Sequence, residues 1–340
     1  MAFELTSLSK ISETSSVSVF TEAVRKAEKP IVIRGLVKDW PLVKAGNESV
    51  LTLLDYLAGN AKSGPIRFLE APDGSNGYFF YNDRLDGFNF ERRQTTFKGF
   101  VDRLINHLGR KQAPVLSIQS AYVDEYFDKV GDENRMDVLG EAVRARIWIG
   151  NATRVATHND DAENIACVAA GRRRFVLFPP EQLSNLYVGP LEVTPAGAPV
   201  SLASLIDPDF DRYPKLKDAL GAGSFSELEP GDAIYIPTLW WHHVEGLEAV
   251  NVLVNYWKGG AVGGEAKPGG FDTLLMAMLA LRPLPLQQRK AWQAWFDHYV
   301  FNGNNDEIEH IPPAMRGILD ELKPDRRKQI KQWLIKQLSD

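Results

Sequence analysis

Cysteine is nearly absent from this chain of 340 residues, whose only thiol is Cys167. One cysteine cannot form an intrachain disulfide or build a cysteine-based zinc site. The chain also lacks an apolar run of about 18 residues, the length that a membrane-spanning helix requires. Its first residues lack the basic start and apolar run of a signal peptide. We therefore expect a cytoplasmic protein that does not bind a membrane.

An excess of positive charge is missing as well. The chain has 39 Lys and Arg against 44 Asp and Glu, which gives a formal net charge of −5, and the basic residues are scattered among the acidic ones. A nonspecific nucleic-acid surface would need a basic patch or stripe, so we expect no nucleic-acid partner. The 44% of hydrophobic residues is instead typical of a folded domain with ample core material.

Short β-rich runs dominate the middle of the chain. Six of them are separated by turn residues, at positions 115–120, 146–150, 165–169, 174–178, 233–237 and 250–256. This pattern favours a β-sandwich or barrel.

Segments with apolar residues at helical spacing lie before and after this β-rich region. Before it, helices are predicted at 21–29, 49–57 and 97–108, with one buried strand at 30–35. After it, a glycine-rich linker is predicted at 259–270, followed by helices at 271–281, 286–301 and 325–338. We expect three parts: residues 1–114 as an N-terminal α/β part that completes the barrel, residues 115–258 as the core, and residues 259–340 as a C-terminal helical region.

A His-x-Asp triplet lies at His158 and Asp160. On a strand or its extended continuation, the period of two puts both side chains on one face, where a metal could bridge them. Alone, the triplet is a weak signal, and a solvated loop histidine is the favoured explanation for it.

A second segment, residues 229–244, strengthens the metal hypothesis. It combines a Pro-Gly-Asp turn, a short apolar strand, a proline and the run Trp240 to His243. Adjacent strand residues face opposite ways, so only one of His242 and His243 should reach the metal, while at least one tryptophan should pack in the core. Two histidines and one carboxylate suit iron(II) and leave three positions open, whereas a structural zinc site would need a fourth protein ligand.

Three arginines begin the strand at 174–178. Arg173 shares its facing parity with Phe175 and Leu177, and a guanidinium can bind a carboxylate in bidentate fashion. Arg172 and Arg174 are expected on a solvated outer face. For Arg173, parity alone leaves both an outer position and a carboxylate-binding role open.

Together these motifs resemble the cupin-like Jumonji-C oxygenases, in particular the asparaginyl hydroxylase that inhibits hypoxia-inducible factor and bacterial cupin-like proteins found near tryptophan halogenases. The resemblance rests on motifs in the family's order: His158-x-Asp160, Asn164, Gly171-x-Arg173, Leu177 to Pro180, Pro230 to Asp232, Tyr235 to Pro237, Trp240 to His243 and Val254 to Trp257. It implies a mainly β fold, a double-stranded β-helix of the cupin or jelly-roll type with flanking N-terminal and C-terminal α-helices.

The resemblance also implies a ligand set. His158, Asp160 and His242 would bind Fe(II), with 2-oxoglutarate as co-substrate and dioxygen as oxidant. Arg173 stands where the hydroxylase has a lysine for the distal carboxylate of 2-oxoglutarate. Further pocket residues implied are Asn164, Asn255 and the aromatic Trp257.

At two positions this chain differs from the hydroxylase in residues that contact the co-substrate there. Ser117 stands where the hydroxylase has a tyrosine, and Val155 where it has a threonine; Ser117 itself, Gln119, Thr153 or Thr157 could substitute. We expect a 2-oxoglutarate-dependent dioxygenase that hydroxylates a protein side chain, a peptide or a small molecule. The alternatives are a cupin-like regulator that binds a metal or ligand without turnover and, less well supported because no general base is evident, a metal-dependent isomerase or hydrolase.

One helix carries a signal for assembly. Between residues 286 and 301, an aromatic stripe consists of Trp292, Trp295, Phe296 and Tyr299. The stripe could pack on the chain's own barrel, but the resemblance implies that the C-terminal helices pair across a two-fold axis. We expect a homodimer.

Overall fold

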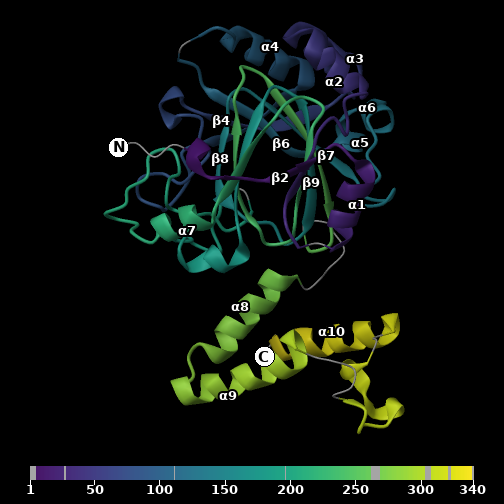
Figure 1. The fold of residues 1–340 in the computed structure, drawn as a ribbon, viewed down its shortest axis with the longest axis vertical. Helices are drawn as coiled ribbons and strands as arrows, with labels where there is room; N and C mark the ends of the chain where they lie inside the picture. Colours follow the sequence, from purple (N-terminus) through teal and green to yellow (C-terminus); the bar gives the residue numbers. More distant parts are fainter. Residues whose placement is uncertain are drawn as a thin grey trace. The chain divides into compact units, whose positions relative to one another are not determined.

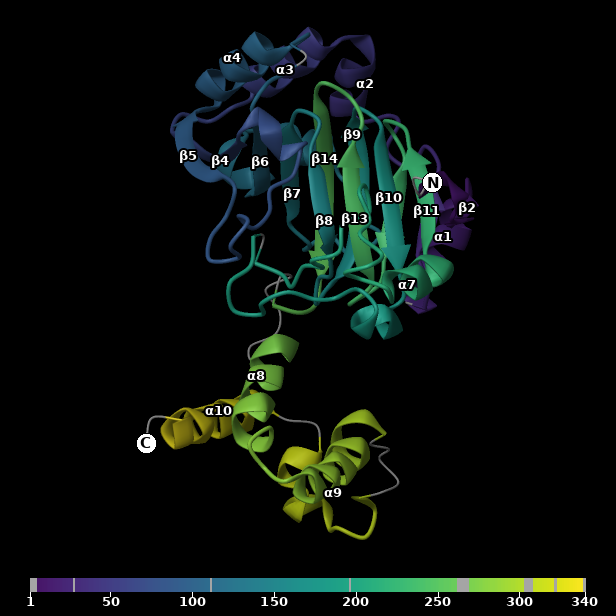
Figure 2. The same ribbon diagram turned by 90° about the vertical axis from the view of Figure 1, so that its left-hand side faces the viewer.

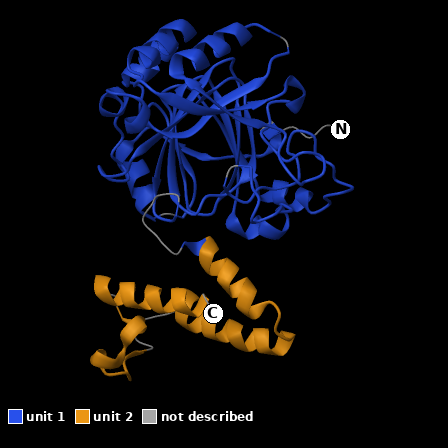
Figure 3. Ribbon diagram, turned by 180° about the vertical axis from the view of Figure 1, so that it is seen from behind, with its two compact units in different colours: residues 1–270 blue, residues 271–340 orange. Residues whose placement is uncertain are grey.

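The computed structural model describes residues 5–26, 28–110, 112–195, 197–261, 269–302, 308–320 and 323–338 (Figure 1). The chain divides into two compact units, Met1–Gly270 and Phe271–Asp340 (Figure 3). The expected N-terminal part and core both fall within the first unit, while most of the expected linker at 259–270 lies outside the described residues. The boundaries at 114 and 258 remain predictions.

A double-stranded β-helix forms the centre of the first unit. Its strands alternate between two sheets as the chain advances, except for two consecutive strands in the middle that share one sheet, and each sheet pairs its strands antiparallel. One sheet has the order β12 (Ala233–Ile236), β9 (Glu163–Ala170), β14 (Asn251–Lys258), β7 (Ala145–Gly150), and the other has the order β11 (Ser224–Leu228), β10 (Arg173–Phe178), β13 (Trp241–Gly246), β8 (Arg154–His158). Figure 2 shows the second set lying side by side. The expected jelly-roll fold is confirmed.

The N-terminal region extends both sheets. β1 (Ser9–Lys10) pairs with β11, while the larger sheet gains β3 (Ile31–Ile33) and β2 (Ser12–Thr14) beyond β12. On its other side β7 is followed by β6 (Val115–Tyr122), β4 (Pro65–Ala71) and β5 (Glu91–Thr96). The larger sheet therefore continues past the barrel, and β5 is its last strand.

Helices bury their apolar faces against the large sheet and against one another. They are α1 (Val17–Lys26), α2 (Pro41–Glu48), α3 (Val50–Gly59) and α4 (Phe97–His107). Ser49 begins α3 because its side chain accepts a hydrogen bond from the Thr52 amide, which would otherwise lack a helical partner. Phe100 of α4 is fully buried edge-on against Phe68 of β4, with ring centroids 5.4 Å apart. All three helices predicted before the barrel are present within a few residues.

Shorter helices connect the strands: α5 (Val123–Tyr126), α6 (Val130–Glu133) and α7 (Leu216–Ala222). The second unit contains α8 (Gly270–Leu281), α9 (Leu286–Phe296), which continues into a π-helical turn at Asp297–Phe301, and α10 (Pro324–Leu338). Within that unit the described side chains of α8, α9 and α10 are not buried. Among the helices in the described ranges, none combines the length and apolar character needed to cross a bilayer.

Candidate metal centre

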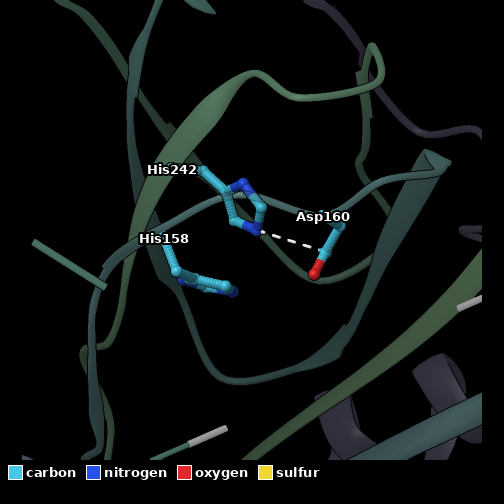
Figure 4. A group of neighbouring side chains, drawn as sticks. All are labelled: His158, Asp160 and His242. Atoms are coloured by element: carbon cyan, nitrogen blue, oxygen red, sulfur yellow. Dashed lines mark ion pairs between the residues drawn. The ribbon is translucent and has the colours of Figure 1, made fainter. Parts of the chain in front are cut away.

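Two neighbouring strands bring three ligands together. His158 ends β8 and pairs directly opposite His242 of β13, and Asp160 follows two residues after β8. The two imidazole rings have centroids 4.1 Å apart, and His242 Nε2 lies 3.6 Å from Asp160 Oδ2 (Figure 4). One ligand atom from each residue falls within 4.8 Å of the others, close enough to surround a single metal ion.

Backbone carbonyls fix the orientation of both histidines. The Nδ1 atom of His158 lies 2.9 Å from the Ala156 carbonyl oxygen, and that of His242 lies 3.0 Å from the Trp240 carbonyl oxygen. A carbonyl oxygen only accepts, so each Nδ1 carries the proton and donates it. Each Nε2 lone pair is thereby left available for a metal.

The electrostatics of the three residues also suit a metal ion. Burial, reinforced by the neighbouring His158, lowers the pKa of His242 to about 4, so the ring is neutral near pH 7. The Asp160 side chain is only 11% exposed, and its Oδ2 atom is buried without a hydrogen-bond donor. A buried carboxylate oxygen without a donor needs a cation or water for compensation. Two histidines and a buried aspartate side chain therefore form a ligand set that suits iron(II).

A cavity of about 360 Å³ opens beside the three ligands, and Arg173 forms part of its wall. Arg173 is 5% exposed, and its Nε atom has no hydrogen-bond acceptor. Burial lowers the pKa of its guanidinium to about 10, and no carboxylate among the described residues forms an ion pair with it. A buried cation of this kind is well suited to receive the carboxylate of a bound small molecule.

The structure shows the predicted facing of the three arginine side chains, with Arg173 on the side opposite to Arg172 and Arg174. Arg173 and Phe175 both line the cavity. Arg172 faces outward, where its Nε donates to Glu248 Oε1 at 2.8 Å. Arg174 also points away from the cavity, but it is only 23% exposed because it pairs with Glu227 at 2.7 Å. It is thus an ion-pair residue and not a freely solvated one.

Most of the polar and aromatic residues predicted for the pocket line the cavity. The side chains of Asn164, Asn255, Trp257 and Gln119 line the cavity. Asn255 Nδ2 donates to Asn164 Oδ1 at 2.8 Å across adjacent strands, while Asn255 Oδ1 is buried without a donor. The pair is thus fixed, with one acceptor left for a ligand.

Other residues proposed from the sequence lie elsewhere. Ser117 is buried in β6 and its hydroxyl donates to the Ile118 carbonyl oxygen at 3.3 Å; it does not line the metal cavity. Thr157 faces a separate cavity of about 250 Å³ because it precedes His158 on a strand whose successive side chains alternate. Thr153 is likewise not among the cavity residues. Of the four proposed substitutes, only Gln119 reaches the site.

The two adjacent histidines point in opposite directions, as strand parity requires. His243 also lines that separate cavity, and its Nε2 atom lies 3.7 Å from Glu245 Oε1. Trp241 is 1% exposed in a cluster with Phe178 and Phe225, so it serves the core.

Arg146 and Trp148 are among the residues of the cavity wall that sequence reasoning missed. Both lie on β7 two positions apart, and the Arg146 guanidinium carbon lies 5.0 Å from the Trp257 ring centroid. The parity of the predicted strand at 146–150 was the available signal. It did not reveal which face turned inward.

Fold and site define this protein as a cupin-type protein with a candidate metal site of two histidines and one carboxylate. Residues 16–257 match the family described as "Cupin-like domain". The chain belongs to this cupin-like family of Jumonji-C oxygenases.

Three curated relatives illustrate the range of the family. The chain is 34% identical over 271 residues to lysine-specific demethylase JMJ31 of Arabidopsis thaliana, which covers 70% of this chain and 47% of that protein. It is 30% identical over 149 residues to tRNA wybutosine-synthesizing protein 5 of Gallus gallus, covering 44% and 41%. It is 26% identical over 261 residues to bifunctional peptidase and (3S)-lysyl hydroxylase JMJD7 of Homo sapiens, covering 67% and 77%. The chain thus spans about half or less of the first two relatives.

Proposed function

We propose that the protein is an Fe(II)- and 2-oxoglutarate-dependent oxygenase that hydroxylates its substrate. The observation that carries this proposal is the position of Arg173, a buried guanidinium without a carboxylate partner in the same cavity as His158, Asp160 and His242. A metal site alone would fit many cupin functions. A metal site that shares a small cavity with an unpaired buried cation fits a chelating dicarboxylate.

The chain's own residues would act mainly by positioning. His158, Asp160 and His242, which line the cavity, would hold the metal. Arg173 fixes the distal carboxylate of 2-oxoglutarate, and the free oxygen of Asn255 can accept a hydrogen bond from a ligand or water. The apolar side chains of Phe175, Val155 and Val244 exclude water from the cavity wall. Bound iron would supply the activation of dioxygen, coupled to oxidative decarboxylation of 2-oxoglutarate to succinate and carbon dioxide.

The names of the relatives support an oxidative reaction but not one substrate. Lysine appears in the names of the demethylase and the hydroxylase, and a tRNA base in that of the third protein. Since these proteins share the fold and differ in target, the substrate of this chain must be inferred from its own cavity and rim.

A non-catalytic regulator is the second candidate. It is favoured by Ser117 and Val155, which replace two co-substrate contacts expected from the resemblance, and by the position of Ser117 outside the cavity. Such a protein would bind iron and 2-oxoglutarate without consuming either.

Turnover in the absence of a primary substrate separates the two candidates. Purified full-length chain would be loaded with iron(II) and incubated with 2-oxoglutarate, ascorbate and air, and succinate would be quantified by mass spectrometry. The proposal predicts enzyme-dependent succinate that disappears in His158→Ala and Asp160→Ala. Binding of 2-oxoglutarate by iron-loaded protein without any succinate above the variants would favour the regulator.

A further inference from the structure

The wall of the metal cavity continues onto strands outside the barrel. Strands β6, β4 and β5 follow β7 in the large sheet (Figure 2). In their register Leu69 pairs with Arg92 and Ser117, and Arg67 pairs with Gln94. Arg67 and Leu69 are two positions apart on β4, so Arg67, Gln94 and Arg92 share one face. Phe68 occupies the opposite face, where it packs on α4.

This face borders a recess of about 480 Å³ that adjoins the metal cavity. The recess is lined by Arg67, Arg92 and Gln94, and it shares Gln119, Ser120 and Trp148 with the metal cavity. A ligand that enters the metal cavity can therefore extend over this shelf, by which we mean the Arg67–Gln94–Arg92 face of β4 and β5.

The charge of this surface is opposite to that of the whole chain. Among the described lining residues of the two cavities there are six arginines, and Asp160 is the single carboxylate, although the formal net charge of the chain is −5. The arginines are Arg67, Arg92, Arg93, Arg146, Arg154 and Arg173. The excess of positive charge is therefore a property of this surface and does not follow from the overall composition.

Two of these arginines are free to meet a ligand. Arg93 pairs with Glu91 at 2.7 Å, and Arg154 lies 3.6 Å from Glu245, so both are compensated. Arg67 and Arg92 are exposed and form no ion pair with any residue in the described ranges. The Arg92 guanidinium instead lies 5.7 Å from the Phe88 ring centroid, an arrangement that keeps it over the surface.

We propose that the primary substrate is an acidic peptide segment, which lies along the shelf with its carboxylates at Arg67 and Arg92 and its reacting residue in the metal cavity. This inference rests on the proposed oxygenase function. The arginines attract carboxylates and repel a lysine-rich chain.

The edge of the sheet favours a peptide over a small metabolite. No strand in the described part of the chain pairs with the outer edge of β5 (Glu91–Thr96), so a peptide that crosses the shelf can leave it at this edge without meeting another strand. Neighbouring strands are about 4.8 Å apart, so the surface from β7 to β5 extends roughly 14 Å. That length exceeds the reach of a small metabolite held at the metal.

Direct binding tests the proposal without relying on turnover. Fluorescence anisotropy would compare a labelled dodecapeptide of alternating Glu and Ala with its Gln-for-Glu counterpart and with a labelled oligouridylate, using iron-free full-length protein. Arg67→Gln and Arg92→Gln would be compared with Arg25→Gln, a change at an exposed arginine on α1.

The acidic peptide should bind more tightly than its neutral counterpart and weaken at higher salt. Each shelf variant should weaken it by about 5-fold and the double variant by more than about 10-fold, as exposed charge pairs do, while Arg25→Gln leaves binding unchanged. Equal binding of the two peptides, or equal loss in Arg25→Gln, would overturn the proposal. Tighter, shelf-dependent binding of oligouridylate would also overturn it, since the partner would then be a nucleic acid. None of these outcomes depends on succinate formation, so the oxygenase function stands or fails separately.

Discussion

His158 and His242 lie directly opposite each other in the β8–β13 pair, and each donates its Nδ1 proton to the carbonyl oxygen two residues earlier in the chain. This shared arrangement turns both Nε2 atoms toward Asp160. The strand register and the backbone therefore set the metal geometry before any metal binds.

Replacing a ligand should abolish metal binding. His158→Ala, Asp160→Ala or His242→Ala each removes one of three ligands, so the iron(II) content after loading should fall to background. The matched control is His243→Ala, which alters the neighbouring strand position but should retain iron, because that ring faces Glu245. Metal analysis of folded, desalted protein provides the measurement; loss of iron in His243→Ala with retention in His242→Ala would reverse the assignment.

Arg173→Gln should weaken 2-oxoglutarate binding by on the order of 2–4 kcal/mol, because one partner of a buried charge pair is lost. Iron content should be unchanged. Calorimetric titration of 2-oxoglutarate into protein loaded with manganese(II) measures the effect, with Arg172→Gln as the control that removes an outward-facing guanidinium. Equal affinity in the Arg173 variant and the parent chain would refute its role.

Arg34, Glu13 and Asp232 form an ion-pair cluster whose contribution to stability should depend on pH. Arg34 donates to Glu13 at 2.6 Å and to Asp232 at 2.7 Å, which links β2 to the turn before β12. The hydrogen bond from Arg34 holds the pKa of Glu13 below its usual 4.5. A carboxyl with a depressed pKa stabilises the fold above its unfolded pKa, and this contribution is lost as pH falls through the folded pKa.

Arg34→Gln should accordingly destabilise the protein at pH 7 by about 1 kcal/mol, a value reduced by partial solvent exposure. The difference from the parent chain should shrink below pH 4.5. Thermal unfolding at several pH values tests this, and Arg135→Gln, which removes an exposed pair with Asp137, is the control. A difference that stays constant through the acid range would argue against the linkage.

We propose that the second unit mediates a homodimer. Trp292, Trp295 and Tyr299 form a ring-contacting stripe on α9 and the π-helical turn, and they are 46%, 59% and 45% exposed. Since large exposed aromatic surfaces mark interaction sites, a second copy of the chain would cover it. Trp295→Glu should dissociate the dimer, whereas Leu183→Glu, at a residue 57% exposed in the first unit, should not. Light scattering that gives a mass near 38.0 kDa for the parent chain would exclude the dimer.

Strands with continuous apolar runs could be located from the sequence, and strands with polar residues could not. The run at 165–169 lies in β9, which is buried almost throughout, so composition alone marks it. No range was predicted for seven strands: β1, β2, β4, β5, β8, β11 and β13. β5 reads Glu-Arg-Arg-Gln-Thr-Thr because nearly all of its residues are exposed at the sheet edge, which leaves no apolar pattern.

The candidate metal ligands could be singled out from the sequence because their spacing is local, whereas the rest of the cavity depends on long-range register. His158 and Asp160 are two residues apart on one side of the chain, and parity separates His242 from His243. The sequence could not show that Ser117 lies outside the cavity, because this depends on how β6 pairs with β7, with an irregular register between Ile118 and Ala121. Such irregularity has no local signature in composition.

Isotope labelling of succinate is the most direct test of the oxygenase function. Iron-loaded protein would be supplied with 2-oxoglutarate under ¹⁸O₂, and the succinate formed would be analysed by mass spectrometry. Oxidative decarboxylation places one atom of dioxygen in the new carboxylate, so the account predicts succinate carrying one ¹⁸O label, formed by the parent chain and not by Asp160→Ala. Unlabelled succinate, or equal labelling with Asp160→Ala, would contradict it.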